Sequence, residues 1–282
     1  MNPVDPASSL LDDFSLEMTG KDVPALAEAQ GLLPAGTRIN VTFLGNEDLP
    51  MRLAAASAVK AGGHVPVPHI SARRLGSAAE LEKFLGALSE AGAVENVFVV
   101  AGDPAEPMGP YEDSLAVIAS GLPAAHGARH ISISGYPEGH PDIGEQTLWS
   151  ALERKLAAVE DQGLDASIIT QFGFDTAPVL AWCEELRARG IDAPVRIGVP
   201  GPAGVKRLLG YARRFGVGTS ASIAHKYGFS LTNLLGTAGP DRFLNQLAAD
   251  HDPARHGVVK LHFYTFGGLR PTAEWVRSFR GY

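Results

Sequence analysis

The sequence predicts a (β/α)8 barrel, formed by a single domain over residues 1–282. Three observations support this fold class. Short runs rich in Val, Ile and Phe recur along the chain, amphipathic stretches separate them, and the eighth run lies near the C-terminus. An open, doubly wound sheet would also alternate strands with helices, but the count of eight and the position of the last strand favour closure.

The predicted strands are short apolar runs, most of them bounded by residues that favour turns. In chain order they are Phe14–Met18, Arg38–Leu44, His64–Ile70, Asn96–Asp103, His130–Tyr136, Ser167–Phe174, Pro194–Pro200 and Val258–Phe266. The stretches 78–92 and 147–163 repeat apolar residues at helical spacing and end at a glycine, so both are predicted helices. Ser77, followed three residues later by Glu80, predicts a capping box before the first of them.

Two segments depart from a minimal barrel. Residues 216–238, between the seventh and eighth strands, supply extra material that we expect to be helical and to cover the substrate mouth. Residues 1–12 precede the first strand, and we expect them to form a flexible tail.

Composition excludes several classes of protein. The chain has 24 basic and 31 acidic residues, a formal charge of −7, and no basic stripe of the kind that binds nucleic acid. No apolar run reaches the roughly 20 residues that span a membrane, and the N-terminus lacks the pattern of a secretion signal. We therefore expect a cytoplasmic protein. The one cysteine, Cys183, lies in a helical run and is expected to be a reduced, buried thiol.

Polar residues stand where the predicted strands end. Barrel enzymes place their chemistry at the C-terminal ends of the strands, so these side chains are expected to share one rim. A single polar residue at a strand end often only caps the next helix, but here six consecutive strands supply one. The residues are Glu17, Thr42, His69, Asp103, Tyr136 with His140, and Gln171.

Other kinds of site find little support. His64 and His69 point to opposite faces of a strand, and no cluster of Cys, His and carboxylates accompanies them, so no metal site is expected. The stretch 216–221, G-V-G-T-S-A, matches a dinucleotide-binding fingerprint but follows a helical run instead of a strand. The chain has neither a G-x-S-x-G elbow nor a Walker A loop.

Four motifs together resemble bacterial methylenetetrahydrofolate reductases. They are V-A-G-D-P at Val100–Pro104, G-Y-P-E-G-H-P at Gly135–Pro141, I-T-Q-F-G-F-D at Ile169–Asp175 and L-H-F-Y-T at Leu261–Thr265. A P-H motif at Pro68–Ser71 also stands where the family has one. The resemblance covers essentially the whole predicted barrel.

The resemblance implies a barrel that holds FAD at its C-terminal face. NAD(P)H would reduce the flavin, and the reduced flavin would then transfer hydride to 5,10-methylenetetrahydrofolate, giving 5-methyltetrahydrofolate for methionine synthesis. The reaction could also run in the oxidative direction in a demethylation pathway. The family commonly forms homo-oligomers.

The resemblance also implies roles for individual residues. Glu17 matches the family's general acid, which protonates the departing nitrogen of the methylene bridge. Asp103 matches an aspartate that binds the pterin and influences the flavin, and Gln171 a residue that binds pterin or nicotinamide. Arg154 and Lys155 match a basic pair suited to the FAD pyrophosphate. Positions that correspond to cofactor contacts are Thr42, His69, Gly102, Tyr111, Gly135, Tyr136 and His140.

The chain departs from the family pattern at several contacts. Ala101 stands where the family has an arginine, and Leu148 and Ala151 replace acidic and amide contacts to the adenosine part of FAD. Arg270 is a candidate substitute for the family's folate-binding arginine. These changes imply weaker FAD binding and leave two alternatives open: direct hydride transfer from NADH without flavin, as in some relatives, or a non-catalytic barrel that binds folate or flavin. Retention of Glu17, Asp103 and Gln171 together argues against the non-catalytic barrel, since a binder would not need the acid.

Overall fold

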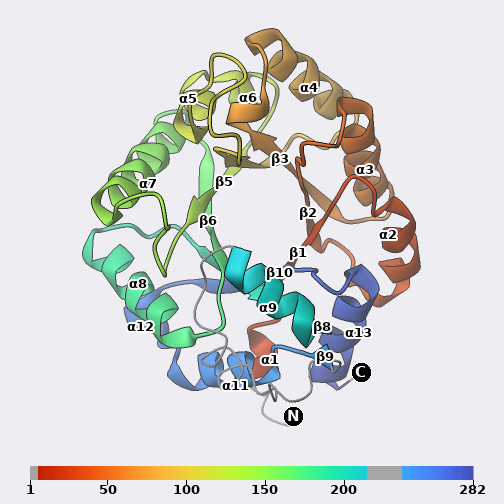
Figure 1. Cartoon of the computed structure of the whole chain (residues 1–282), viewed down its shortest axis with the longest axis vertical. Helices are drawn as coiled ribbons and strands as arrows, with labels where there is room; N and C mark the ends of the chain where they lie inside the picture. The colour runs from red at the N-terminus through yellow and green to blue at the C-terminus, as the bar shows by residue number, and fades with distance from the viewer. Residues whose placement is uncertain (1–5, 215–236, 282) are drawn as a thin grey trace.

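The predicted barrel is confirmed. We analysed a computed structural model that describes residues 6–214 and 237–281 (Figure 1). Eight parallel strands close in the order β1-β10-β7-β6-β5-β4-β3-β2, and the seam is closed by β10 pairing with β1, where Ser15 lies opposite His262. The strands are β1 Ser15–Met18, β2 Arg38–Val41, β3 Val65–Ser71, β4 Asn96–Val100, β5 His130–Gly135, β6 Asp165–Phe172, β7 Val195–Pro200 and β10 Val259–Tyr264.

Several strands end earlier than their apolar runs predicted. β2 stops at Val41 instead of Leu44, and β4 stops at Val100 instead of Asp103. In the second case the backbone explains the difference, because Gly102 has a φ of +94° and leaves the extended conformation. The residues beyond these strand ends therefore belong to the rim, where they are free to face a ligand.

Helices surround the barrel (Figure 1). The main ones are α2 Val23–Ala29, α3 Leu49–Ala61, α4 Ala78–Glu90, α5 Ser114–Ala119, α6 Leu122–Ala125, α7 Glu145–Glu160, α8 Thr176–Ala188, α11 Asp241–Asp250, α12 Pro253–His256 and α13 Leu269–Arg280, with 3-10 turns η1 at Gln30–Leu32 and η2 at Ala72–Arg74. Ser77 caps α4, since its hydroxyl accepts from the Glu80 amide. The other half of the predicted capping box differs, because the Glu80 carboxylate accepts from the amide of Gly76.

The expected N-terminal tail is wrong from Pro6 onward, while residues 1–5 lie outside the described residues. Pro6–Ser9 form the short helix α1, which packs against α11. Ala7, Leu10 and Leu11 are buried, and their spacing places them on one face of a helical turn. This apolar face provides a packing reason for the order of the segment.

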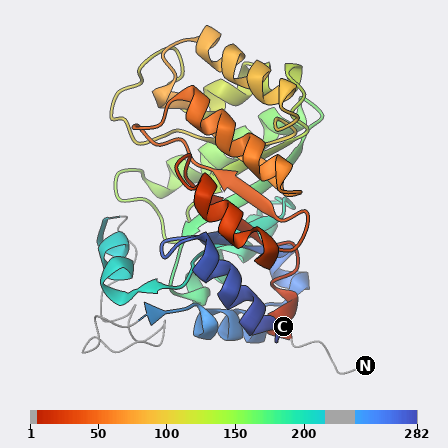
Figure 2. The ribbon, with the colours of Figure 1, turned by 90° about the vertical axis from the view of Figure 1, so that its right-hand side faces the viewer.

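Most of the expected extra segment at 216–238 also lies outside the described residues. The chain that leads into it forms β8 Ala203–Gly204 and the helix α9 Val205–Arg214, and the chain that leaves it forms β9 Thr237–Ala238. β8 and β9 pair as antiparallel strands. Figure 2 shows α9 standing clear of the ring of helices, on the side of the barrel opposite α1.

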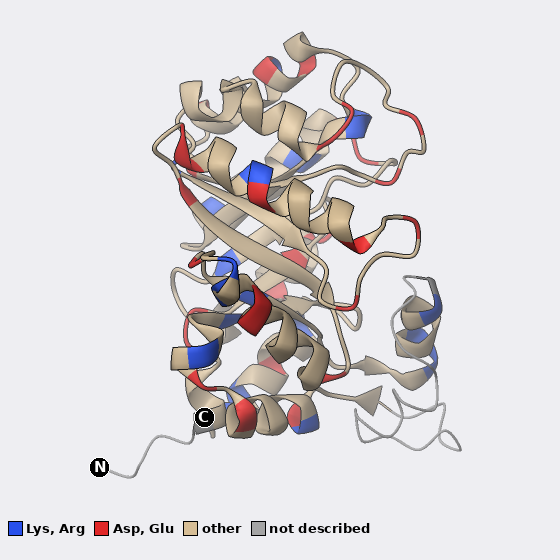
Figure 3. Ribbon diagram, turned by 90° about the vertical axis from the view of Figure 1, so that its left-hand side faces the viewer, with Lys and Arg blue, Asp and Glu red and all other residues tan. Residues whose placement is uncertain are grey.

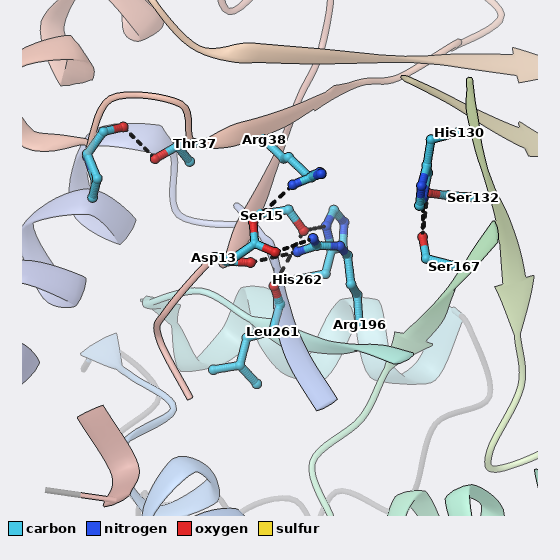
Figure 4. Close-up of polar contacts among 11 residues, drawn as sticks. Asp13, Ser15, Thr37, Arg38, His130, Ser132, Ser167, Arg196, Leu261 and His262 are labelled. Atoms are coloured by element: carbon cyan, nitrogen blue, oxygen red, sulfur yellow. Dashed lines mark hydrogen bonds and ion pairs between the residues drawn. The ribbon is translucent and has the colours of Figure 1, made fainter. Parts of the chain in front are cut away.

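The barrel interior contains many polar side chains. Inward-facing residues of such barrels are usually branched and apolar, yet here the apolar inner cluster consists of Val67, Phe98 and Ile169, with Val100 packed against it. The polar inner residues form hydrogen-bonded groups, which Figure 4 shows. One group is Ser132, Ser167 and His130, and another is Asp13 with Arg38 and Arg196. The larger apolar core lies between the strands and the helices.

Candidate active site

A chain of polar side chains crosses the closing seam of the barrel. The Oε2 atom of Glu17, on β1, lies 3.5 Å from Nε2 of His262 on β10. The other ring nitrogen of His262 lies 2.9 Å from the hydroxyl of Ser15 (Figure 4). His262 is fully buried, and the Thr265 hydroxyl donates a 2.6 Å hydrogen bond to the Glu17 carbonyl. The arrangement links a rim carboxylate to an imidazole and a hydroxyl deeper in the barrel.

The electrostatics of Glu17 differ from the expectation of a carboxyl held neutral by its surroundings. Burial raises the pKa of Glu17, but the hydrogen bond to His262 and the charges of His69 and His262 oppose it. The net effect is a pKa below the ordinary value. Glu17 is therefore a carboxylate at neutral pH, and His262 is its hydrogen-bonding partner.

His69, on β3, is buried at the same mouth and held by two contacts. Its Nε2 atom lies 3.4 Å from the side-chain nitrogen of Asn40, and its ring packs edge-on to Phe98 at 4.7 Å. Burial lowers the pKa of His69 to about 4, with Glu17 acting in the opposite direction. His69 is therefore neutral at pH 7 and offers a polar ring without charge.

Three residues of the mouth leave room and hydrogen-bonding capacity for a flat ligand. The Thr42 and Ser71 hydroxyls are buried and have no hydrogen-bond partner among the described residues. A Cβ atom added to Gly102 would lie 2.2 Å from the Ser71 hydroxyl, so only glycine fits there. Buried hydroxyls without partners are costly, and a ligand with ring heteroatoms would satisfy them.

Asp103 lies at the outer edge of the mouth and is paired with a cation that the sequence did not reveal. Its side chain is 72% exposed and forms an ion pair with Arg74 of η2, itself 17% exposed. Arg74 lies directly over Gly45, where a Cβ atom would be 2.4 Å from the guanidinium. Arg74 thus supplies a positive charge beside Asp103, although Ala101 lacks the arginine of the family pattern.

The end of β5 brings two of the expected residues together. Tyr136 and His140 pack edge-on with ring centroids 5.5 Å apart, and Gln171 donates a 3.2 Å hydrogen bond to the carbonyl of Gly139. Gly135 also has a packing role. A Cβ atom there would lie 2.7 Å from both Ile168 and Trp182, so this glycine accommodates the packing of α8.

Three expected cofactor residues are not brought to the mouth. Tyr111 is buried in the apolar core between the strands and the helices. Arg154 is exposed whereas Lys155 is buried, so the two cations of α7 do not form one patch. Burial lowers the pKa of the Lys155 amine to about 8, opposed by Asp113.

The remaining expected residues near the adenosine and folate tail have other surroundings. Leu148 lines a cavity of about 330 Å³ between the end of β5, α7 and α8, next to Trp149 and Trp182. Arg270 forms an ion pair with Glu274 one turn along α13 and is exposed. The structure therefore does not place Arg270 in the polar chain at the mouth.

The described residues offer neither a cluster of metal ligands nor a membrane-spanning helix. No group of three or more His, Cys, Asp or Glu side chains in 6–214 and 237–281 is arranged to hold a metal ion. Within the same part of the chain, no helix has the length and apolar character needed to cross a membrane.

Comparison with known proteins identifies the family of this barrel. The sequence profile of methylenetetrahydrofolate reductase matches residues 19–274, which is most of the chain. The chain belongs to the methylenetetrahydrofolate reductase family. The resemblance carried by the rim motifs is thereby confirmed at the level of the family.

Curated relatives are distant and longer. The chain is 31% identical over 155 residues to a probable methylenetetrahydrofolate reductase (NADH) of Oryza sativa subsp. japonica, covering 48% of this chain and 25% of that protein. It is 26% identical over 197 residues to methylenetetrahydrofolate reductase (NADH) 1 of Arabidopsis thaliana, covering 61% and 31%. A third relative, methylenetetrahydrofolate reductase 2 of Saccharomyces cerevisiae, is 33% identical over 84 residues, or 30% of this chain and 13% of that protein. The matches thus span less than a third of each relative's length.

Solved structures resemble the chain only weakly. Dihydropteroate synthase from Thermus thermophilus has a TM-score of 0.48 and 17% identity, covering 94% of this chain and 92% of that one. A dihydropteroate synthase from Coxiella burnetii has a TM-score of 0.49 and 11% identity, covering 95% and 92%.

Proposed function

We propose that this protein is a methylenetetrahydrofolate reductase, which reduces 5,10-methylenetetrahydrofolate to 5-methyltetrahydrofolate with NAD(P)H and FAD. The observation that carries the proposal is the Glu17–His262–Ser15 chain at the mouth of a barrel of this family. The reaction needs a proton and a hydride at neighbouring atoms of the substrate, and this chain provides a route for the proton.

The rim of the mouth fits the ring of a flavin. The unpartnered hydroxyls of Thr42 and Ser71, neutral His69 and the unobstructed backbone of Gly102 suit a flat ring with polar edges. A bound flavin would supply a centre that takes hydride from NAD(P)H and passes it on. The surrounding residues would orient the ring and exclude water from one of its edges.

Glu17 and His262 would manage the proton. The methylene bridge must open to an electrophilic iminium before it accepts hydride, and opening requires a proton on the departing nitrogen. Because the Glu17 pKa lies below its ordinary value, we propose that the proton reaches the substrate from the Glu17–His262 pair and not from Glu17 held neutral alone. Ser15 would position His262 through its other ring nitrogen.

Asp103 and Gln171 would recognise the pterin. A carboxylate accepts hydrogen bonds from the amino and ring N–H groups of a pterin, and an amide both donates and accepts. Asp103 is exposed and held by Arg74, so a pterin would replace or share that ion pair. Gln171 is held near the mouth by its bond to Gly139.

The substitution Glu17→Gln tests the assignment. We expect turnover of methylenetetrahydrofolate to fall about 10²- to 10⁴-fold, while reduction of added FAD by NADH persists. Glu28→Gln, an exposed carboxylate of α2, is the matched control and should retain both activities. Equal folate turnover in Glu17→Gln and in the native protein would exclude Glu17 from the proton route.

Hydride transfer directly from NADH, without flavin, is a second candidate. It is favoured by the residues expected to hold the FAD adenosine diphosphate, because Arg154 and Lys155 have different exposures and Leu148 lies against a pocket with two tryptophans. An absorbance spectrum of the purified protein, followed by activity with and without added FAD, separates the two mechanisms. A protein that binds folate tightly but never oxidises NADH or NADPH would instead be a non-catalytic barrel.

A further inference from the structure

A β-bulge interrupts the pairing of β6 with β7 at the mouth of the barrel. The pairs Ile169–Arg196 and Phe172–Gly198 flank the irregularity, so two residues of β6 stand opposite one residue of β7. Gln171 is one of these two. A bulge bends its strand and changes the direction of a side chain, and bulges are frequent next to active sites. Here the bulge coincides with a residue that we expect to contact the substrate.

Side-chain hydroxyls supply hydrogen bonds at the bulge. The Thr170 hydroxyl accepts a 2.8 Å hydrogen bond from the Gly198 amide and donates a 2.9 Å hydrogen bond to the Gln171 carbonyl. The Tyr264 hydroxyl of β10 donates a 3.0 Å hydrogen bond to the Thr170 carbonyl. Burial raises the pKa of Tyr264 well above its ordinary value, so the phenol keeps the proton that it donates. Backbone groups buried in a barrel need such partners, and two hydroxyls provide them here.

The close approach of β7 to the bulge requires glycine at position 198. A Cβ atom there would lie 2.5 Å from the Thr170 carbonyl oxygen and 2.7 Å from the Gln171 carbonyl oxygen. Tyr264 lies on β10, and β7 stands between β10 and β6. The Tyr264 side chain therefore crosses β7 to reach Thr170, and the missing side chain of Gly198 leaves room for this crossing.

The residues that hold the bulge are uncharged, and one of them is out of reach of a ligand. Thr170 is 0% exposed, whereas Gln171 is half-buried. Charged residues lie mainly on the helices and loops around the barrel (Figure 3), and none occurs in the bulge itself. Thr170 can therefore influence a bound ligand only through its neighbours.

The Gln171 side chain has donor and acceptor capacity to offer a ligand. Its amide nitrogen donates a 3.2 Å hydrogen bond to the Gly139 carbonyl, in the segment that follows β5. An amide has two N–H donors and a carbonyl acceptor, and this is the one side-chain hydrogen bond that Gln171 forms within the described part of the chain. The direction of the remaining groups depends on where the bulge places the Gln171 backbone.

We propose that Thr170 and Tyr264 are positioning residues, which hold the bulge in β6 and thereby orient the Gln171 amide towards the substrate. The inference rests on the proposed function, in which Gln171 recognises the pterin. An amide binds a pterin by donating and accepting in fixed directions, so a change in backbone direction at Gln171 weakens these hydrogen bonds together.

The variants Thr170→Val and Thr170→Ser test the inference, because only the second keeps the hydroxyl. We expect Thr170→Val to raise the KM for methylenetetrahydrofolate about two- to tenfold, as for the loss of one hydrogen bond, while kcat changes much less. Thr170→Ser should keep the native KM. Thr37→Val is the control, since it removes a 2.7 Å hydroxyl-to-carbonyl bond at the opposite end of the barrel and should leave the KM unchanged.

Combination with Gln171→Ala distinguishes positioning from a general loss of stability. In the Gln171→Ala background, Thr170→Val should raise the KM no further, because the side chain that it orients is absent. Tyr264→Phe removes the other hydroxyl and carries the same comparison if Thr170→Val does not fold. A native KM in both single variants, or the same increase with and without the Gln171 side chain, would overturn the inference and leave the proposed function standing.

Absence of folate turnover by the native protein would instead refute the proposed function. Calorimetric titration with 5-methyltetrahydrofolate then decides the role of the bulge. Binding that is weaker in Thr170→Val, native in Thr170→Ser and insensitive to Thr170→Val in the Gln171→Ala background supports the inference. Equal affinity in all variants, or no binding by the native protein, overturns it.

Discussion

The buried histidine at the mouth should make the protein sensitive to mild acid. His69 is packed against Phe98 and Asn40, and burial lowers its pKa from 6.5 to about 4. Between these two pH values the unfolded chain binds a proton at this position that the folded protein does not bind. The stabilising effect of neutral His69 is therefore complete above pH 6.5 and is lost as the pH falls towards 4.

The size of the effect follows from the two pKa values. Each pH unit in this interval costs about 1.4 kcal/mol of folding free energy per histidine. Lowering the pH from 7 to 5 should therefore reduce the stability contributed by His69 by about 2 kcal/mol. At pH 5 the neighbouring carboxylate of Glu17, whose pKa lies below 4.5, is still largely ionised, so Glu17 contributes little to the change.

Urea unfolding of the native protein and of His69→Gln at pH 7 and pH 5 measures this difference. The variant should lose about 2 kcal/mol less between the two pH values, whatever its stability at pH 7. His130→Gln offers an independent comparison, because burial and the charges of Arg38 and Arg196 lower the pKa of His130 to about 4 as well. The same pH dependence in the native protein and in His69→Gln would show that His69 is protonated equally in both states and would refute the reasoning.

Three further predictions concern particular contacts. Gly102→Ala should lower the free energy of unfolding by about 1–2 kcal/mol because of the left-handed backbone alone. It should also bind FAD more weakly because the added methyl group would contact the Ser71 hydroxyl. Urea unfolding and a flavin titration measure the two effects, and unchanged values for both would contradict a role of Gly102 in leaving room for the ring. Cys183 is buried and its pKa is raised to about 12 by burial, so iodoacetamide at pH 8 should modify it only as fast as the protein unfolds, and rapid labelling of folded protein would refute this. Arg196→Met removes the hydrogen bonds from Arg196 to Asp13 and should lower the free energy of unfolding, measured in urea, by about 2 kcal/mol. A variant as stable as the native protein would show that these bonds make no net contribution to stability.

The strand positions were predictable because a parallel barrel strand is a local pattern. Each of the eight apolar runs overlaps an observed strand, since burial on both faces requires apolar residues in a short segment. Strand ends were less predictable. Val100 and Gly102 lie in one apolar run, but pairing stops where the neighbouring strand β3 ends, at Ser71. The N-terminal turn was predicted to be a flexible tail. Leu10 and Leu11 are instead buried against the rest of the protein, and a local sequence pattern does not reveal such contacts.

The candidate site was predictable only in part, because several of its contacts join segments that lie far apart in the sequence. The motifs pointed to Glu17, His69 and Gln171 as rim residues, and the polar partners of Glu17 were not singled out. His262 is 245 residues away from Glu17 in sequence and becomes its neighbour because the last strand closes the barrel against the first. Arg74 was missed likewise, because its ion pair with Asp103 joins segments that follow different strands.

The sequence by itself determined the fold class, the family and the residue types that reach the rim, because these depend on periodicity and on motifs contained within single segments. Only the tertiary structure decided which of those residues act together. It turned Gly135 towards Trp182, placed Tyr111 among the helices and gave Glu17 a histidine partner that lowers its pKa. Exposure and pKa depend on neighbours that lie far apart in the chain, so they are set when the barrel closes.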